Sequence, residues 1–223
     1  SVFGKNSDLE LITHIYDNEQ QILKIGYKSK IFNIKLNLIG KIQIKNILMA
    51  IVAAINSNLD INNITKIIDK IKPVEGRLEK IGTLKNKSKV LLDYAHTPDA
   101  LETVLINIKD QFPLSKICLV FGCGGDRDKD KRFKMGKIAS TYANKIYLTD
   151  DNPRSEDPKK IRNEIKKGIK NKNVQEIPKR KDAILKCIND LCSGDIAIIA
   201  GKGHEKTQDY KGRKSFFSDR NEI

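Results

Sequence analysis

The chain has 223 residues, 39% of them hydrophobic, which is enough for one large or two small folded domains and excludes a disordered protein. The net charge of +14 does not by itself indicate a nucleic-acid partner, because the lysines are scattered and no basic stripe alternates with aromatic residues. No apolar run approaches the roughly 18 residues of a membrane span, and residues 1–12 lack a signal-peptide pattern, so we expect a cytoplasmic protein without nucleic-acid or membrane partners.

The first part of the chain alternates apolar and polar residues, which is typical of half-buried strands. Three such segments, separated by short polar breaks, lie at 9–17, 20–27 and 31–38. Apolar residues at helical spacing follow over 40–58, and a second helical segment over 60–71 has Asp60 as its predicted N-cap. The pattern therefore predicts an antiparallel meander followed by two helices.

The rest of the chain contains short apolar segments separated by helical ones, which indicates a parallel sheet with crossover helices. The strand candidates are 89–95, 116–122, 145–150, 173–178 and 195–201. Thr97 and Asp157 each precede a proline and are predicted helix N-caps. We predict a Rossmann-like, doubly wound, mostly parallel α/β domain over 78–223, ending in a hairpin at 207–218. A small antiparallel β plus helix unit over 1–77 precedes it.

The four cysteines do not have the spacing of a metal site. Cys118 and Cys123 are five residues apart, as are Cys187 and Cys192, whereas zinc sites commonly use C-x₂-C pairs. Cys118 lies in an apolar strand candidate and Cys187 in a helical segment. We therefore expect reduced, buried side chains at these two positions and no metal ligands.

Polar loops follow the strand candidates, at the sheet edge where an open parallel sheet binds its ligand. These loops are 93–99, 122–132, 149–157 and 201–208. Arginine pairs bidentately with carboxylates, whereas aspartate and glutamate accept hydrogen bonds from ammonium groups. The sequence therefore predicts a pocket for a small molecule with both groups, lined by Arg127, Asp151, Asn152, Arg154 and Glu205, with Pro153 stiffening the turn.

Each loop also has a purely structural interpretation. Asp93 and His96 can serve as turn and capping residues, the glycine-rich run 122–125 can form a plain tight turn, and 128–132 can be a solvated helix start. Glycines in that run can also bring backbone N–H groups close to an anion. A nicotinamide site is not predicted, because Arg127 stands where G-x-G-x-x-G requires its third glycine.

Four runs of sequence resemble the Mur ligase family. They are LLDYAHTPDALETVL (91–105), FGCGGDRDKDKRFKMG (121–136), TDDNPRSEDP (149–158) and AGKGHE (200–205). The resemblance extends from about residue 40 to residue 219. Its most specific element is DNPR at 151–154, which in that family marks members that add meso-diaminopimelate, and not lysine, to UDP-N-acetylmuramoyl-L-alanyl-D-glutamate.

The resemblance implies ATP-dependent amide formation in peptidoglycan precursor synthesis, with an acyl phosphate that the diaminopimelate amine attacks. It implies diaminopimelate contacts at Arg127, Asp151, Asn152, Pro153, Arg154, Gly201 and Glu205. It implies ATP contacts at Asn46, Arg77, Asp93 and His96. No catalytic residue or metal ligand is assigned in this chain, because Mg²⁺ is expected to bind mainly to a part of the family's central domain that this sequence does not contain.

The family has an N-terminal UDP-binding domain, a central ATPase domain and a C-terminal Rossmann-like domain that receives the amino acid. No G-x-x-x-x-G-K-[ST] phosphate loop occurs in this sequence. We therefore expect a fragment that is inactive alone, with the end of the central ATP-binding domain in 1–77 and the amino-acid-binding domain in 78–223. Two alternatives stay open: a family member that adds another amino acid such as L-lysine, and a non-catalytic amino-acid-binding α/β module.

Overall fold

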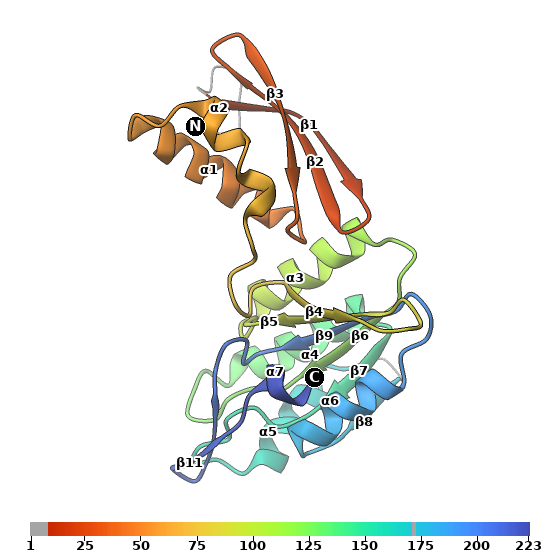
Figure 1. Cartoon of the computed structure of the whole chain (residues 1–223). Coiled ribbons are helices and arrows are strands. Elements are labelled where there is room, and N and C mark those ends of the chain that lie inside the picture. The colour runs from red at the N-terminus through yellow and green to blue at the C-terminus, as the bar shows by residue number, and fades with distance from the viewer. Residues whose placement is uncertain (1–8, 171–172) are drawn as a thin grey trace. The chain divides into compact units, whose positions relative to one another are not determined.

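The computed structural model describes residues 9–170 and 173–223 (Figure 1). Most of the segment interpreted above as lacking a signal peptide lies outside the described residues. The chain divides into two compact units, formed by Ser1–Pro73 with Asp110–Phe112 and by Val74–Lys109 with Pro113–Ile223. The assignment of 1–77 and 78–223 to the central and C-terminal domains of a ligase stays a prediction.

The first unit contains the predicted antiparallel meander. Its strands are β1 (Leu9–Asp17), β2 (Gln20–Tyr27) and β3 (Lys30–Leu36). Alternate residues of β2 and β3 are buried, among them Leu23, Ile25, Ile34 and Leu36, because successive side chains of a strand point to opposite faces. Helix α1 (Ile42–Asn56) packs on this face through Ile44, Ile47, Leu48 and Ile51, so the two elements share one hydrophobic core.

The single helix predicted over 60–71 is wrong. The structure has a short helix α2 (Ile61–Thr65) and a separate 3₁₀ turn η1 (Ile68–Lys70). Isoleucine, asparagine and aspartate make up most of this segment, and these residues are weaker helix formers than alanine or leucine. Asp60 is nevertheless the N-cap of α2, as predicted, and its side chain accepts from the backbone N–H groups of Asn62 and Asn63.

The second unit is built on a six-stranded sheet with the order β4-β5-β9-β6-β7-β8 (Figure 1). Five strands are parallel, which confirms the predicted Rossmann-like, mostly parallel fold. They are β5 (Lys89–Asp93), β6 (Ile117–Phe121), β7 (Lys145–Leu148), β8 (Val174–Glu176) and β9 (Ile196–Ala200). Every residue of β6 and β9 is buried, because helices cover both faces of the sheet.

An antiparallel edge strand, β4 (Glu79–Thr83), pairs with β5 and was not predicted from the sequence. Its sequence, EKIGT, has one isoleucine among charged, small and polar residues. An edge strand is paired on one side only, so its sequence does not need the continuous apolar run that identifies the central strands.

Four helices connect the parallel strands: α3 (Pro98–Gln111), α4 (Asp130–Tyr142), α5 (Pro158–Lys166) and α6 (Arg180–Asn189). Crossovers of this kind are right-handed, so α3, α4 and α5 lie on one face, and α6, which returns the chain from β8 to β9, lies on the other. The predicted N-caps are confirmed, since Thr97 Oγ1 accepts from Ala100 N and Asp157 accepts from Lys159 N.

The strand order brings four loops to one edge of the sheet. The chain crosses the sheet from β5 through β6 and β7 to β8 and then returns to β9, which lies between β5 and β6. Ligands of open α/β sheets bind beyond the carboxyl ends of the strands. The loops after β5, β9, β6 and β7 therefore lie next to one another in that order. The chain ends with the predicted hairpin, β10 (Thr207–Tyr210) and β11 (Arg213–Phe216), and a short helix α7 (Asp219–Glu222).

All four cysteines are free thiols. Cys118 and Cys187 are buried, as predicted, and Cys123 is buried as well, whereas Cys192 is exposed. Burial raises the pKa of the Cys118 thiol to about 11 and that of Cys123 to about 12, so both thiols are protonated at neutral pH. Within the described part of the chain, no helix combines the length and the apolar character that crossing a membrane requires.

Candidate functional site

A cavity of about 490 Å³ lies beyond the carboxyl ends of the central strands of the second unit. The cavity is lined by six of the residues predicted to contact diaminopimelate: Arg127, Asp151, Asn152, Arg154, Gly201 and Glu205. His96, which was predicted to contact the nucleotide, lines the same cavity together with Tyr94 and Lys131. The strand order thus gathers residues that are more than 100 positions apart in the sequence.

The remaining predicted residues lie elsewhere. Pro153 is buried and lies outside the cavity lining. Arg77, which precedes β4, and Asp93, the last residue of β5, also lie outside it. Asn46 belongs to α1 of the first unit, where its side-chain amide is exposed and donates to Gln43 Oε1 at 3.2 Å. The binding roles proposed for all these residues stay predictions.

The amide of Asn152 has three hydrogen-bond partners. Its Oδ1 atom accepts from Lys202 Nζ at 3.1 Å and from the backbone N–H of Asp209 at 3.1 Å. Its Nδ2 atom donates to Glu205 Oε2 at 3.0 Å. Two donors face the amide oxygen and one acceptor faces the amide nitrogen, so only one of the two amide orientations satisfies all three partners.

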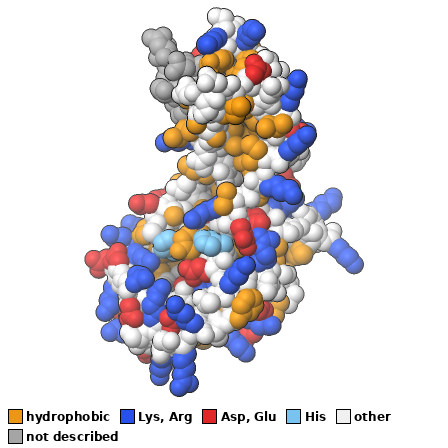
Figure 2. All heavy atoms as spheres, turned by 60° about the vertical axis from the view of Figure 1, so that its left-hand side comes forward, with side chains coloured by type: hydrophobic (Ala, Val, Ile, Leu, Met, Phe, Trp, Pro, Cys, Tyr) orange, Lys and Arg blue, Asp and Glu red, His pale blue; other side chains and the backbone are white. Residues whose placement is uncertain are grey.

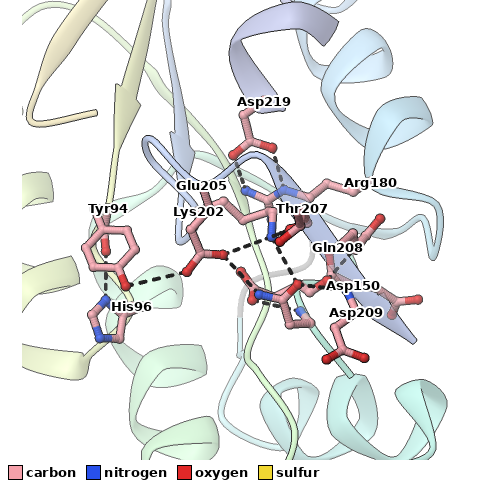
Figure 3. Close-up of polar contacts among 12 residues, drawn as sticks. Tyr94, His96, Asp150, Arg180, Lys202, Glu205, Thr207, Gln208, Asp209 and Asp219 are labelled. Carbon is pink, nitrogen blue, oxygen red and sulfur yellow. Dashed lines mark hydrogen bonds and ion pairs between the residues drawn. The ribbon is translucent and has the colours of Figure 1, made fainter. Parts of the chain in front are cut away.

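Lys202 was not among the predicted site residues, although it is one of the largest fully buried side chains of the chain. Its Nζ atom donates to the backbone oxygen of Thr207 at 2.6 Å and to Glu205 Oε2 at 3.1 Å, besides Asn152 (Figure 3). The sequence places this lysine between two glycines in a polar loop, which is a typical exposed setting. Only the fold shows that the ammonium group is enclosed.

Glu205 retains its negative charge despite being partly buried. Burial raises the pKa of its carboxyl group, but the Lys202 ammonium and the hydrogen bonds from Lys202 and Asn152 outweigh burial, so the pKa lies below its ordinary value. Arg154 lowers this pKa further. The other carboxylate oxygen, Oε1, lies 3.5 Å from the hydroxyl of Tyr94 (Figure 3). The cavity thus has one wall with an ionised carboxylate.

Arg154 provides a positive charge on the turn that follows β7. Its backbone is left-handed, with φ of 51°, and is paired with the hairpin through Asp209 O and Lys211 N. Its Nη1 atom donates to the backbone oxygen of Gly125 at 2.7 Å, which directs the guanidinium group along the cavity wall. Arg127 is exposed at the cavity rim, and its Nη1 donates to Asp126 O at 3.1 Å.

The glycine-rich run after β6 is needed for packing against this turn. A Cβ atom on Gly125 would lie 1.9 Å from the backbone oxygen of Pro153, and one on Gly122 would lie 2.2 Å from that of Thr149. The backbone N–H of Gly125 donates to Asn152 O at 2.9 Å. The two loops therefore approach one another backbone to backbone, which only glycine permits.

A network of buried charged residues stabilises the turn after β7. Asp150 forms an ion pair with Arg162 of α5 and accepts from the hydroxyl of Tyr210 at 2.9 Å. Burial raises the pKa of Asp150, against the opposing effect of Arg162 and Tyr210. Arg162 Nε also pairs with Glu176 at the end of β8, at 3.0 Å. The turn is thereby connected to α5, to β8 and to the hairpin.

A second ion pair joins the turn to α4. The guanidinium of Arg132 is fully buried and binds both carboxylate oxygens of Glu156, at 2.8 and 3.0 Å, and Glu164 at 2.5 Å. Glu156 Oε1 also accepts from the backbone N–H of Asp126 at 2.7 Å. The Arg132 hydrogen bond is the main reason that the pKa of Glu156 falls to about 2.

Asp93 organises the loop after β5. One carboxylate oxygen accepts from Leu78 N and the other from Ala95 N, both at 2.7 Å, and burial raises the pKa of the group against these bonds. Arg77 is exposed, and its guanidinium lies 4.6 Å from the centre of the Tyr94 ring. The structural interpretation of Asp93 as a turn residue is therefore supported by direct contacts.

His96 and His204 both lie close to the ring of Tyr94. Their rings are 4.5 and 5.2 Å from the Tyr94 ring, and both are exposed. Figure 2 shows histidine side chains at the surface among acidic and basic ones. His96 Nδ1 lies 2.9 Å from Tyr94 O, which accepts a hydrogen bond when that nitrogen carries the proton. Across the described residues, no three His, Cys, Asp or Glu side chains are grouped as a metal site would need.

The fold and the cavity define a doubly wound α/β domain with a charged small-molecule pocket beyond the carboxyl ends of its parallel strands. The sequence pattern of the family described as "Mur ligase, glutamate ligase domain" matches residues 76–203, which is more than half of the chain. The chain belongs to the Mur ligase family.

Individual relatives agree with this assignment. A "UDP-N-acetylmuramoyl-L-alanyl-D-glutamate--2,6-diaminopimelate ligase" from Rickettsia typhi is 41% identical over 217 residues, which cover 97% of this chain and 43% of the relative. A solved structure of an enzyme with the same name is 33% identical, with a TM-score of 0.74, and the match covers 99% of this chain and 45% of that one.

A more distant likeness concerns the fold alone. The folylpolyglutamate synthase of Mycobacterium tuberculosis, solved with ADP and AMPPCP, has a TM-score of 0.70 at 19% identity, covering 88% of this chain and 46% of its own. This chain therefore spans less than half the length of each of these three proteins.

Proposed function

We propose that this chain is the amino-acid-receiving part of a ligase that adds meso-diaminopimelate to UDP-N-acetylmuramoyl-L-alanyl-D-glutamate at the expense of ATP. The observation that carries the proposal is the cavity, which has the guanidinium of Arg154 and the carboxylate of Glu205 in its lining. The two charges are close enough for Arg154 to lower the pKa of Glu205. The names of the relatives described above point to the same substrate.

An amino-acid centre carries one carboxylate and one ammonium group, and the cavity offers a partner for each. Arg154 binds a carboxylate through its planar fork, and Glu205 accepts hydrogen bonds from an ammonium group. Lysine presents an ammonium group at the end of its side chain but no second carboxylate. With lysine bound in the same way, the guanidinium of Arg154 would lose its ionic partner in a partly dry pocket. This is why the proposal favours diaminopimelate over the lysine alternative.

The proposed nucleotide contacts are exposed groups, of which His96 belongs to the cavity lining and Arg77 lies beside it, over Tyr94. ATP supplies the phosphoryl group that turns an otherwise unreactive carboxylate into one that an amine can attack. His96 lines the cavity, and Arg77 presents an exposed guanidinium above Tyr94, so a cation and a ring face are available to phosphate and base. Asp93 serves these residues by holding Leu78 and Ala95 in place. No step is assigned to Mg²⁺, because the described residues do not form a group of metal ligands.

Calorimetric titration of the purified chain with meso-diaminopimelate, L-lysine and ATP analogues tests the proposal. We expect diaminopimelate to bind more tightly than lysine by at least about tenfold, the equivalent of 1.4 kcal/mol. Equal binding of both amino acids would favour the lysine-adding alternative. Binding of neither amino acid, with the chain shown to be folded, would contradict an amino-acid site in this cavity. Amide formation in a longer protein that carries the same residues then tests the reaction itself.

A further inference from the structure

Lys202 is enclosed behind the cavity wall and has three oxygen acceptors within 3.1 Å. Burying an ammonium group is costly unless every contact compensates for it, so a loop lysine is rarely enclosed without a reason. We propose that Lys202 is a positioning residue, which orients the Asn152 amide and the Glu205 carboxylate for recognition of a zwitterionic amino acid. This inference rests on the proposed function and assigns a role to a residue that does not itself line the cavity.

The Asn152 amide can satisfy its partners in one direction only. An amide side chain can be turned over by half a rotation, which exchanges its acceptor and its donor. Lys202 Nζ and the backbone N–H of Asp209 both donate, so the amide oxygen must face them. The NH₂ group therefore faces Glu205, and Asn152 belongs to the cavity lining. Among the residues that the structure describes, Glu205 is its one acceptor, which leaves the second N–H for a ligand carboxylate.

The two oxygens of the Glu205 carboxylate have different partners. Its Oε2 atom accepts from both Lys202 and Asn152, so this oxygen is occupied and the plane of the carboxylate is set. The Oε1 atom has the Tyr94 hydroxyl at 3.5 Å, which is at the limit of a hydrogen bond. Oε1 is therefore the oxygen that a ligand ammonium group can reach. Lys202 thus decides which oxygen is used internally and which one faces the ligand.

Charged and titratable groups from every neighbouring element act on Glu205. Lys202 comes from the same loop, Arg154 from the turn after β7, Tyr94 from the loop after β5 and Arg180 from α6. Lys202 has the largest effect of any group that lowers the pKa of Glu205, and it opposes the rise caused by burial. Without the Lys202 ammonium group, the pKa of the Glu205 carboxyl should therefore rise. On acidification, Glu205 would then become neutral at a higher pH than in the original chain, and a bound ammonium group would lose its ionised partner there.

The decisive variant is Lys202→Met, which keeps an unbranched side chain one atom shorter and removes the charge and the donors. Lys202→Gln, which retains a donor, is a second variant in case the first does not fold. Lys186→Met is the matched control, because Lys186 forms an exposed ion pair with Asp190 on α6, away from the cavity lining. Folding of each variant is checked first by circular dichroism.

The first measurement needs no ligand. Carbon-detected NMR titration of the Glu205 carboxyl group should give a higher pKa in Lys202→Met and in Lys202→Gln than in the original chain, and no change in Lys186→Met. The second measurement is the Kd of meso-diaminopimelate against pH. At neutral pH we expect a loss on the order of 10- to 100-fold in Lys202→Met, as for a charged hydrogen bond. As the solution is acidified, Lys202→Met should lose its affinity for diaminopimelate at a higher pH than the original chain does.

The outcomes separate positioning from a general effect on folding. In a Glu205→Gln background, Lys202→Met should cost much less binding than alone, because its partner no longer carries charge. Additive losses, or an unchanged pKa of Glu205 in folded Lys202 variants, would overturn the inference, as would failure of both variants to fold. If the original chain binds no diaminopimelate, the proposed function fails. The ligand-free titration of Glu205 still decides whether Lys202 sets its charge.

Discussion

The hydroxyl of Tyr210 donates to Asp150 Oδ2 at 2.9 Å, and this bond ties the C-terminal hairpin to the turn that carries Asp151, Asn152 and Arg154. Two backbone hydrogen bonds support the connection, from Arg154 N to Asp209 O and from Lys211 N to Arg154 O. Gln208 Nε2 adds a bond to Asp151 O at 2.7 Å. A hairpin whose own side chains lie outside the cavity lining therefore sets the geometry of the cavity wall.

Tyr210→Phe should destabilise the second unit by about 1 to 3 kcal/mol, because the buried Asp150 carboxylate loses a hydrogen bond that nothing replaces. The measurement is urea unfolding followed by circular dichroism. Tyr142→Phe is the matched control, since it removes a hydroxyl that donates to Glu102 at the surface, and it should change stability less. If both variants lose the same free energy of unfolding, the hydrogen bond between Tyr210 and Asp150 stabilises the chain no more than one at the surface.

Gly125→Ala should destabilise the chain by at least roughly 1 to 3 kcal/mol, since the new methyl group would lie 1.9 Å from Pro153 O and the loops after β6 and β7 would have to separate. Gly82→Ala on β4 is the control, because no atom lies within 4 Å of the added Cβ. Its effect should stay within about 0.5 kcal/mol. Thermal unfolding of both variants compares them directly, and a neutral Gly125→Ala would contradict the close approach.

The ion pair between Arg132 and Glu156 should make stability depend on pH in the acidic range. The folded pKa of Glu156 is about 2, below the ordinary 4.5, so its contribution is present above about pH 4.5 and is lost as pH falls toward 2. Glu156→Gln should lower stability at neutral pH and flatten the dependence between these values. Chemical unfolding at a series of pH values measures the slope. A slope as steep as that of the original chain would show that other carboxyl groups cause it.

Arg154→Ala should weaken diaminopimelate binding on the order of 10- to 100-fold and should narrow its advantage over lysine, because only diaminopimelate has a carboxylate for the guanidinium group. Arg154→Lys should restore little, since an ammonium group cannot form the bidentate fork. Arg213→Ala, on the exposed strand β11, is the control and should leave both affinities unchanged. An unaltered ratio of the two affinities in Arg154→Ala would mean that the turn has a structural role only.

Local sequence signals were sufficient for much of the fold. The N-caps at Asp60, Thr97 and Asp157 depend on bonds between residues two or three positions apart, and all three are confirmed. The apolar runs of β6 and β9 identify strands that are buried on both faces. Rules of α/β topology then placed the polar loops at one edge of the sheet, and six predicted residues line one cavity there.

Other features were decided by contacts between distant segments. The edge strand β4 is a strand because β5 offers it a partner, and its own sequence has no strand pattern. The order of the sheet, with β9 between β5 and β6, follows from helix and sheet packing that no local run encodes. Lys202 looks like an exposed loop lysine in the sequence. It is enclosed because Asn152 approaches it from the turn after β7 and because the chain between Lys202 and Thr207 folds back on it, and these contacts exist only in the folded chain.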